Sequence, residues 1–217
     1  MSLVLAIRAN GKAYFMADRR ILSGYSIERD QGKMVILSSR KDGHAHDIVI
    51  GVCGEVRMMT ILNDARIQSK LLQAYQDAPT IWGMVDAIRD AFVANGIKPE
   101  ESPGGASRFV LGLLIGIDGD VYDVSRTLTI IGIPPDELCA IGSGSEAACA
   151  FWAGKGHMPG AITPVLEGDD LARAIDDVHR LRLQNVFDYV SRVDTCVGAT
   201  TDFYSYDLPS APSPSTP

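Results

Sequence analysis

The first hydroxyl of the chain belongs to Ser2, which directly follows Met1. A Ser hydroxyl is a poor nucleophile near neutral pH unless a base lies within hydrogen-bonding distance. A residue that begins a mature chain carries its own base, because its α-amine has a pKa of about 8. The initiator Met is commonly removed before a small residue such as Ser, and its removal would expose both groups. Ser2 is therefore a candidate nucleophile that needs no propeptide.

Other reactive patterns are weaker. Residues 142–145, Gly-Ser-Gly-Ser, form a Gly-rich turn that resembles a phosphate-binding loop, but they lack the Lys of a P-loop and the Gly spacing of a dinucleotide site. His44 and His46 lie beside Asp47 in an expected loop, and the sequence places no third metal ligand near them. The other two histidines have no neighbouring Ser or Cys motif that would predict a Ser-His-Asp hydrolase. We expect no metal site and no cofactor.

Charge and hydropathy exclude several classes of function. The 217 residues carry 20 Lys and Arg against 27 Asp and Glu, a net charge of −7 without a long basic run. This balance argues against binding to nucleic acid or to an anionic membrane surface. The longest apolar run, residues 109–117, is far shorter than the roughly 20 residues that span a bilayer. We expect a soluble, cytoplasmic protein with one well-buried core.

The four cysteines are widely spaced in apolar contexts and include no CxxC pair. We expect buried free thiols, as in a reducing cytoplasm, rather than a disulfide framework. They are Cys53, Cys139, Cys149 and Cys196.

Two hairpins are expected at the start of the chain. Asn10-Gly11 separates two β-rich runs, which is a strong hairpin signal. A second pair of runs flanks a polar loop at residues 40–46. The four expected strands are residues 3–8, 12–17, 33–39 and 47–53.

Helical spacing begins after these strands. Apolar residues recur from Val56 to Tyr75, which predicts one helix of about twenty residues. Thr80 is a typical N-cap for the next helix. The further expected helices are residues 81–94, 146–153 and 169–192. The further expected strands are residues 108–117, 120–124, 127–131, 138–141 and 202–206.

The order of these elements predicts the architecture. Near-continuous apolar strands indicate sheets that are covered on both faces. We predict an α+β fold, a four-layer αββα sandwich of two antiparallel sheets, each covered by a pair of helices. It would be a single domain over residues 1–208, and the Pro- and Ser-rich tail at 209–217 would be disordered.

This order and six short strings together resemble the proteasome β-type subunits and their bacterial relatives, including the HslV peptidase, within the N-terminal nucleophile hydrolase superfamily. The resemblance covers nearly the whole chain before the tail. The strings occur in the family's order and at compatible spacings. They are residues 2–11, 17–20 (Ala-Asp-Arg-Arg), 33–35 (Lys-Met-Val), 52–54 (Val-Cys-Gly), 140–145 and 194–198 (Asp-Thr-Cys-Val-Gly).

The resemblance implies a set of catalytic residues. Ser2 falls on the position of the family's nucleophilic Thr, and Asp18 on the Asp that follows the second strand. Lys33, held by Asp18, would lower the proton affinity of the amine and stabilise the alkoxide. Gly54, at a strand-to-helix junction, would present its N–H to the developing oxyanion.

The resemblance also implies a supporting pair and reveals two departures. Ser143 and Asp194 would position the amine and relay water. Ser2 replaces the family's Thr, which changes the rotamer restriction of the nucleophile. Val197 replaces a Ser, so the hydroxyl that its counterpart offers near the amine is missing.

Residue-by-residue resemblance places a substrate pocket beside these groups. Its walls would be Ile21, Val52 and Val56, with Gln31 placed less directly because the preceding loop is one residue shorter. These walls are uncharged and mostly apolar, so we expect cleavage after apolar residues.

The resemblance further implies a homo-oligomer, either stacked rings or an open helical assembly, that encloses its sites. Its substrate would be a peptide or an unfolded protein, and a separate ATPase unfoldase is a possible partner. Met- and Leu-rich helix faces are candidates for burial between subunits. The named candidates are Met58, Met59, Leu62 and Leu71, and packing in the core is the alternative for Met58 and Met59.

Three functions are consistent with these observations. The first is a self-compartmentalising peptidase with a Ser nucleophile. The second is an inactive ring or shell subunit of the same kind, and the third is a small-molecule amidase of the same superfamily. The peptidase is favoured because the chain retains the hydroxyl together with the other implied catalytic positions, several of which a decayed site would have lost.

Overall fold

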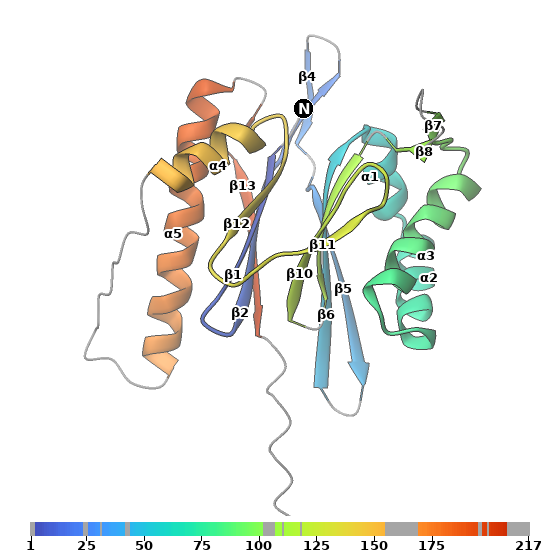
Figure 1. Ribbon diagram of the computed structural model, residues 1–217, viewed down its shortest axis with the longest axis horizontal. Coiled ribbons are helices and arrows are strands. Elements are labelled where there is room, and N and C mark those ends of the chain that lie inside the picture. Colours follow the sequence, from blue (N-terminus) through green and yellow to red (C-terminus); the bar gives the residue numbers. More distant parts are fainter. Residues whose placement is uncertain are drawn as a thin grey trace, which may run out of the picture.

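The computed structural model describes residues 3–23, 26–30, 32–41, 44–101, 107–109, 111–117, 119–154, 169–194, 197–198 and 200–207. In these residues two antiparallel sheets pack face to face, and helices cover both outer faces (Figure 1). The αββα sandwich predicted from the sequence is therefore confirmed. The tail predicted at 209–217 lies outside the described residues.

The first sheet has the strand order β12-β1-β2-β13. Helices α4 and α5 cover its outer face (Figure 1). Its strands are β1 (Leu3–Ala9), β2 (Lys12–Asp18), β12 (Leu138–Gly142) and β13 (Thr201–Asp207). The helices are α4 (Ser145–Gly154) and α5 (Asp169–Val193).

The second sheet has the order β11-β10-β9-β6-β5, and three helices cover its outer face. Its strands are β5 (Met34–Lys41), β6 (His44–Gly54), β9 (Leu111–Ile117), β10 (Asp120–Val124) and β11 (Ile130–Gly132). The helices are α1 (Val56–Leu62), α2 (Ala65–Asp77) and α3 (Ile81–Ala94). Two short hairpins join β3 (Arg20–Ser23) to β4 (Ser26–Asp30) and β7 (Glu100–Glu101) to β8 (Ser107–Arg108).

The hairpin predicted at Asn10-Gly11 is confirmed. Asn10 has φ 51° and Gly11 has φ 71°, and two successive positive φ values are typical of the type I′ turns that match the twist of paired strands. The register then places Val4 opposite Ala17. This pairing brings the start of the chain next to the end of β2, where the candidate site lies.

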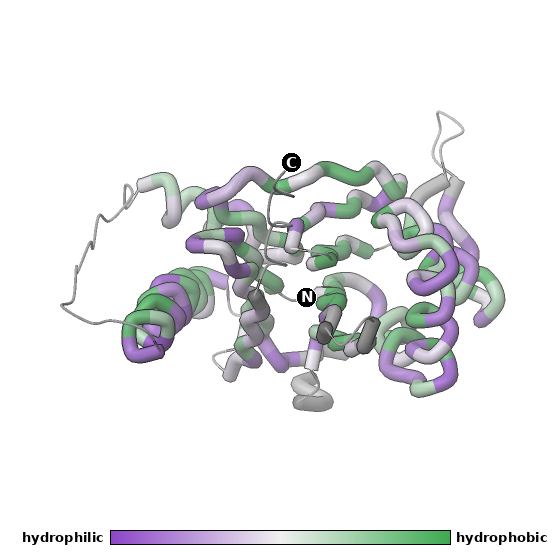
Figure 2. Tube along the Cα trace, turned by 90° about the horizontal axis from the view of Figure 1, so that it is seen from below, coloured by the Kyte–Doolittle hydropathy of each residue, from purple (hydrophilic) through white to green (hydrophobic). Residues whose placement is uncertain are grey.

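Apolar side chains form three layers. One lies between the sheets, one beneath α1–α3 and one beneath α4 and α5. Figure 2 shows α5 with its hydrophobic side toward the sheet and its hydrophilic side outward, as expected of a surface helix. Among the described residues, no helix has the length and apolar character needed to cross a membrane.

The prediction of one helix from 56 to 75 is wrong. The helix breaks between Leu62 and Ala65, and Asp64 caps α2 by accepting a hydrogen bond from the Arg66 N–H at 2.8 Å. An Asn63-Asp64 pair favours caps over helix interiors, because these short polar side chains bond to nearby backbone groups. The apolar spacing continued across the break and concealed it.

The assignment of the Met- and Leu-rich helix faces to subunit contacts is also wrong. Met58, Met59, Leu62 and Leu71 are all buried within the chain itself, in the layer beneath α1–α3. Their spacing reflects packing of the helices on their own sheet, and leaves these side chains no surface for a second subunit.

Two smaller expectations also change. Cys53 and Cys139 are free thiols, buried and half-buried, but the free thiol of Cys149 is exposed on α4. The strand predicted at 127–131 shifts to β11, because the turn before it is closed by Ser125 Oγ, which accepts the Thr129 N–H at 3.2 Å.

Candidate active site

Asp18 is the centre of a buried hydrogen-bond cluster at the end of β2. Its side chain is fully buried. Its Oδ1 accepts hydrogen bonds from the Leu3 N–H at 2.8 Å and from Lys33 Nζ at 2.6 Å. Its Oδ2 accepts one from the Gly198 N–H at 3.1 Å. One carboxylate thus joins three segments that are far apart in sequence, and one of its donors is the amide that follows Ser2.

Lys33 is the only cation paired with this carboxylate in the described part of the chain. The residue is 2% exposed, and its backbone carbonyl accepts the Val52 N–H at 2.9 Å, which fixes it beside β6. Burial lowers the pKa of Lys33, while the charge and hydrogen bond of Asp18 oppose that change. The ammonium is therefore held in a site of low dielectric, where its charge acts strongly on a neighbouring group.

Ser143 and Asp194 form the second polar pair. Ser143 Oγ donates to Asp194 Oδ2 at 2.8 Å, joining the β12–α4 turn to the end of α5. Gly142, one residue earlier, pairs with Leu3 across β1 and β12 and has φ 107°. This conformation suits Gly and places the turn beside the first described residue.

Gly144 fixes the same turn against its surroundings. A Cβ at this position would lie 2.5 Å from Val190 Cγ1, 3.2 Å from Val197 Cγ2 and 3.6 Å from Leu3 Cδ1. Only Gly permits this approach. Val197, which stands where the resemblance implied a Ser, is buried in this apolar contact.

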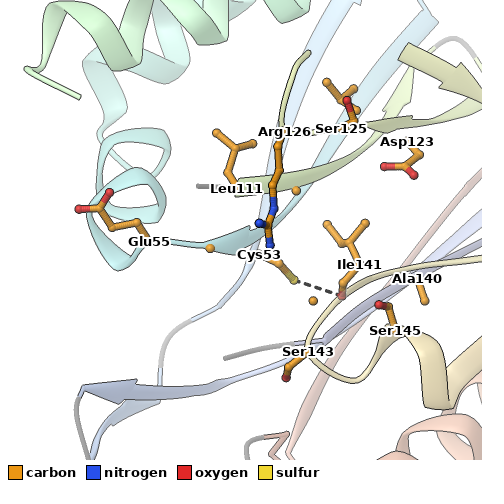
Figure 3. Close-up of a pocket in the computed structure, with 14 residues that line it drawn as sticks. Cys53, Glu55, Leu111, Asp123, Ser125, Arg126, Ala140, Ile141, Ser143 and Ser145 are labelled. Carbon is orange, nitrogen blue, oxygen red and sulfur yellow. Dashed lines mark hydrogen bonds between the residues drawn. The ribbon is translucent and has the colours of Figure 1, made fainter. Parts of the chain in front are cut away.

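A cleft of about 670 Å³ opens between the end of β6 and the β12–α4 turn. Gly54, with φ 144°, and Ser143 both line it. Figure 3 shows Cys53 at one side of the cleft, with its Sγ donating to the Ile141 carbonyl at 3.3 Å, a hydrogen bond that links the two sheets. The cleft is large enough for several side chains of a substrate.

The structure brings four of the six predicted catalytic residues into two pairs and places Gly54 on the cleft. Ser2 lies outside the described residues, directly before the Leu3 amide in the sequence. The pairs are Asp18 with Lys33, and Ser143 with Asp194.

The predicted substrate-pocket residues are not brought together as the predicted catalytic residues are. Val52 is 1% exposed and packs in the layer beneath the helices, whereas Val56 is 39% exposed at the start of α1. Neither lines the cleft. Gln31 and the side chain of Ile21 lie outside the described residues.

Several polar residues of the cleft were not predicted as site residues. Glu55, Asp123, Ser125 and Arg126 all line it. Asp123 could have been found from its position two residues after Val121. A strand directs residues two positions apart to the same face, so an acidic side chain at this position interrupts an apolar surface. Nothing in the sequence indicated that this strand lies near the end of β6.

No family model and no curated protein sequence matches the chain. Solved structures do match it. HslV from Trypanosoma brucei is 14% identical with a TM-score of 0.58, over 94% of this chain and 99% of that chain. BPH from Thiobacillus denitrificans is 13% identical with a TM-score of 0.62, over 96% and 100%, and its complex with epoxomicin also matches. Anbu from Pseudomonas aeruginosa, solved as a helical assembly, is 12% identical with a TM-score of 0.58, over 94% and 81%.

These likenesses define the class of fold. The chain has the same fold as HslV and Anbu over 94% of its length. The resemblance inferred from the sequence is therefore confirmed for the fold.

Proposed function

We propose that this protein is a proteasome-like peptidase that uses Ser2 as its nucleophile after removal of Met1. The observation that carries the proposal is the buried Asp18–Lys33 pair, hydrogen-bonded to the amide of Leu3. A fully buried ion pair is expensive to maintain for stability alone. Its position beside the residue that follows a candidate nucleophile supports a catalytic role.

The mechanism follows from the chemistry of these groups. The Ser2 hydroxyl attacks a peptide carbonyl, and its own α-amine accepts the proton directly or through water. The N–H of Gly54 stabilises the tetrahedral oxyanion. The α-ammonium then gives its proton to the leaving nitrogen, the C–N bond breaks and the amine product leaves, and water hydrolyses the ester of the acyl-enzyme to release the acid and restore the Ser2 hydroxyl.

The remaining residues support these steps. The Lys33 ammonium lowers the proton affinity of the amine and stabilises the alkoxide electrostatically, and Asp18 orients Lys33. Ser143 and Asp194 position the amine and relay water. Ile21, Gln31, Val52 and Val56 form the predicted pocket for an apolar residue at the cleaved position.

The proposal includes self-assembly. The helical assembly of P. aeruginosa Anbu supports a homo-oligomer, as rings or an open helix, that encloses the sites in the cytoplasm. Peptides or unfolded proteins are the proposed substrates, and a separate ATPase unfoldase is a possible partner. Sedimentation is expected to give an oligomer at micromolar concentration, and a monomer would contradict this part.

The test begins with the mass of the intact protein, which is expected to match a chain beginning at Ser2. Ser2→Ala should abolish hydrolysis of fluorogenic peptides, and Lys33→Ala should reduce it by orders of magnitude while the oligomer persists. Ser2→Thr restores the family nucleophile and should retain or raise activity. Full hydrolysis by Ser2→Ala in clean protein would refute the mechanism.

A second candidate function, that of an inactive shell subunit, is favoured by one observation. Val197 is buried where the family offers a hydroxyl near the amine. Epoxomicin distinguishes the readings, since a peptidase is expected to gain the mass of the inhibitor in a Ser2-dependent manner. If wild type and Ser2→Thr both fail to hydrolyse peptides and to react with epoxomicin, the hypothesis of an inactive shell subunit replaces that of a peptidase.

A further inference from the structure

Asp123 occupies an unusual position on β10. It follows Val121 by two residues, so both side chains belong to the face of the strand that meets the other sheet, where Val121 is fully buried. Its cross-strand neighbour Leu114 is also fully buried. An apolar residue is expected at such a position, yet this chain has a carboxylate there.

This carboxylate has no hydrogen bond or ion pair with any described residue. It is half-buried, and burial raises its pKa. Removing a polar group from water without a partner costs free energy, so such groups call for an explanation. The carboxylate of Asp123 lines the cleft, where a ligand can supply the missing partner.

Arg126 offers the opposite charge on the same cleft. It lies just after β10 in a turn fixed by hydrogen bonds. Its carbonyl accepts the Phe109 N–H at 2.9 Å, and Ser125 Oγ accepts the N–H groups of Thr127 and Thr129 at 3.3 and 3.2 Å. Its guanidinium forms no ion pair with any described residue, including Asp123. Figure 3 shows Arg126 and Asp123 apart from each other on the wall of the cleft.

The cleft is continuous with the candidate catalytic groups, because Gly54 and Ser143 line it too. We propose that it reads the charge of a peptide substrate: Asp123 receives a Lys or Arg side chain, and Arg126 receives a Glu or Asp side chain. These contacts lie at positions other than the cleaved residue, whose predicted pocket is apolar. The inference rests on the proposed function, and it names the substrates as peptides that carry both charges in one preferred order.

The experiment measures binding rather than turnover. Ser2→Ala is titrated with fluorescent octapeptides that hold one Leu fixed and carry one Lys and one Glu, in either order and at every spacing. We expect one order to bind on the order of tenfold more tightly than its reverse, because a charge-assisted hydrogen bond forms in one order only. The difference should disappear when Asp123→Asn or Arg126→Gln is added.

Matched controls on α5 separate the site from general electrostatics. Asp170→Asn and Arg173→Gln change the same charges at exposed positions and should leave the preference intact. Equal binding of both orders, or a preference that survives Asp123→Asn or Arg126→Gln, would overturn the inference. Hydrolysis without an order preference would support the proposed function and reject the inference. Order-dependent binding without hydrolysis by wild type would support the inference and reject the proposed function.

Discussion

The β1–β2 hairpin carries a polar cluster at each end. At its open end, Asp18 accepts hydrogen bonds from Leu3, Lys33 and Gly198. At its turn, His179 of α5 is 4% exposed and its Nε2 is 2.8 Å from Asn10 Nδ2. The two clusters share a hairpin, but the open-end cluster is buried whereas the turn cluster is only part-buried, and they join different parts of the chain.

The turn cluster connects the hairpin to one helix. Asp176 of α5 accepts hydrogen bonds from Lys12 Nζ at 2.9 Å and from Tyr14 OH at 3.0 Å. His179 stacks on the Tyr14 ring, with centroids 4.6 Å apart. Asp176 and His179 lie one helical turn apart, so this cluster fixes α5 on the sheet.

The open-end cluster connects segments whose proximity is a property of the whole fold, and it keeps an ammonium away from water. The proposed function gives this arrangement a catalytic role, whereas the turn cluster holds a helix in place. The difference teaches that burial alone does not mark a functional group. What distinguishes Asp18 and Lys33 is a buried ion pair that is hydrogen-bonded to the Leu3 amide near the start of the chain.

The largest expected effect follows Asp18→Ala. Three donors lose their acceptor and Lys33 is left as an uncompensated buried charge, so the free energy of unfolding should fall by about 3–5 kcal/mol. Peptide hydrolysis should be lost as well. Urea unfolding measures the change, with Asp120→Ala as the comparison, because Asp120 bridges Arg8 at a half-exposed site. A loss no larger than that of Asp120→Ala would contradict the distinction between the clusters.

A smaller loss is expected for Asp176→Asn at the turn. Lys12 and Tyr14 lose a charged acceptor, and the cost should be about 1–2 kcal/mol. Hydrolysis per folded molecule should be unchanged, since this end carries no chemistry. The neighbouring Asp177→Asn, on the exposed side of α5, is the matched control and should stay within about 0.5 kcal/mol. A selective loss of turnover in Asp176→Asn would break the comparison.

The turn cluster should also make stability depend on pH. Burial and then Arg182 lower the pKa of His179 from its ordinary 6.5, while Asp136 and Asp176 oppose them. The unfolded chain then binds the proton more readily than the folded one, so this contribution is full above pH 6.5 and is lost as pH falls toward the folded pKa. Urea unfolding of His179→Gln from pH 7.5 to 5 should show a flatter pH dependence than wild type. Parallel curves would show that His179 does not titrate as described.

The smallest effect on stability is expected for Ser143→Ala. Its hydrogen bond to Asp194 lies at the surface, so its loss should cost less than about 1 kcal/mol. Hydrolysis should nevertheless fall, because Ser143 is proposed to position the amine. Ser191→Ala, which removes a surface hydroxyl from α5, should change neither quantity. Unaltered turnover in Ser143→Ala would remove this pair from the proposed site.

Local signals in the sequence predicted much of the fold. Asn10-Gly11 encodes its hairpin because two positive φ values suit these residues, and Thr80 caps α3 by accepting the Gly83 N–H at 3.0 Å. The sequence did not reveal β3 and β4, whose polar residues lack an alternating pattern. The break before Asp64 was missed because apolar periodicity outweighed a cap signal that was present.

The candidate site was predicted unevenly for a similar reason. Asp18, Lys33, Ser143 and Asp194 were named through the resemblance, and the structure pairs Asp18 with Lys33 and Ser143 with Asp194. Asp123 and Arg126 escaped notice because single charges are common on strands and in turns. Their importance depends on lacking partners, which is a property of their surroundings.

The sequence by itself determined the order of the elements, the hairpin turns, several helix caps and the apolar faces, because each is set by residues a few positions apart. Only the tertiary structure decided that Leu3, Lys33 and Gly198 converge on one carboxylate, that the Met- and Leu-rich helix faces are internal, and that β10 and β12 enclose the cleft with β6. These outcomes depend on which sheet each strand joins. That choice is made by packing over the whole chain, where the burial of distant apolar faces outweighs local preference.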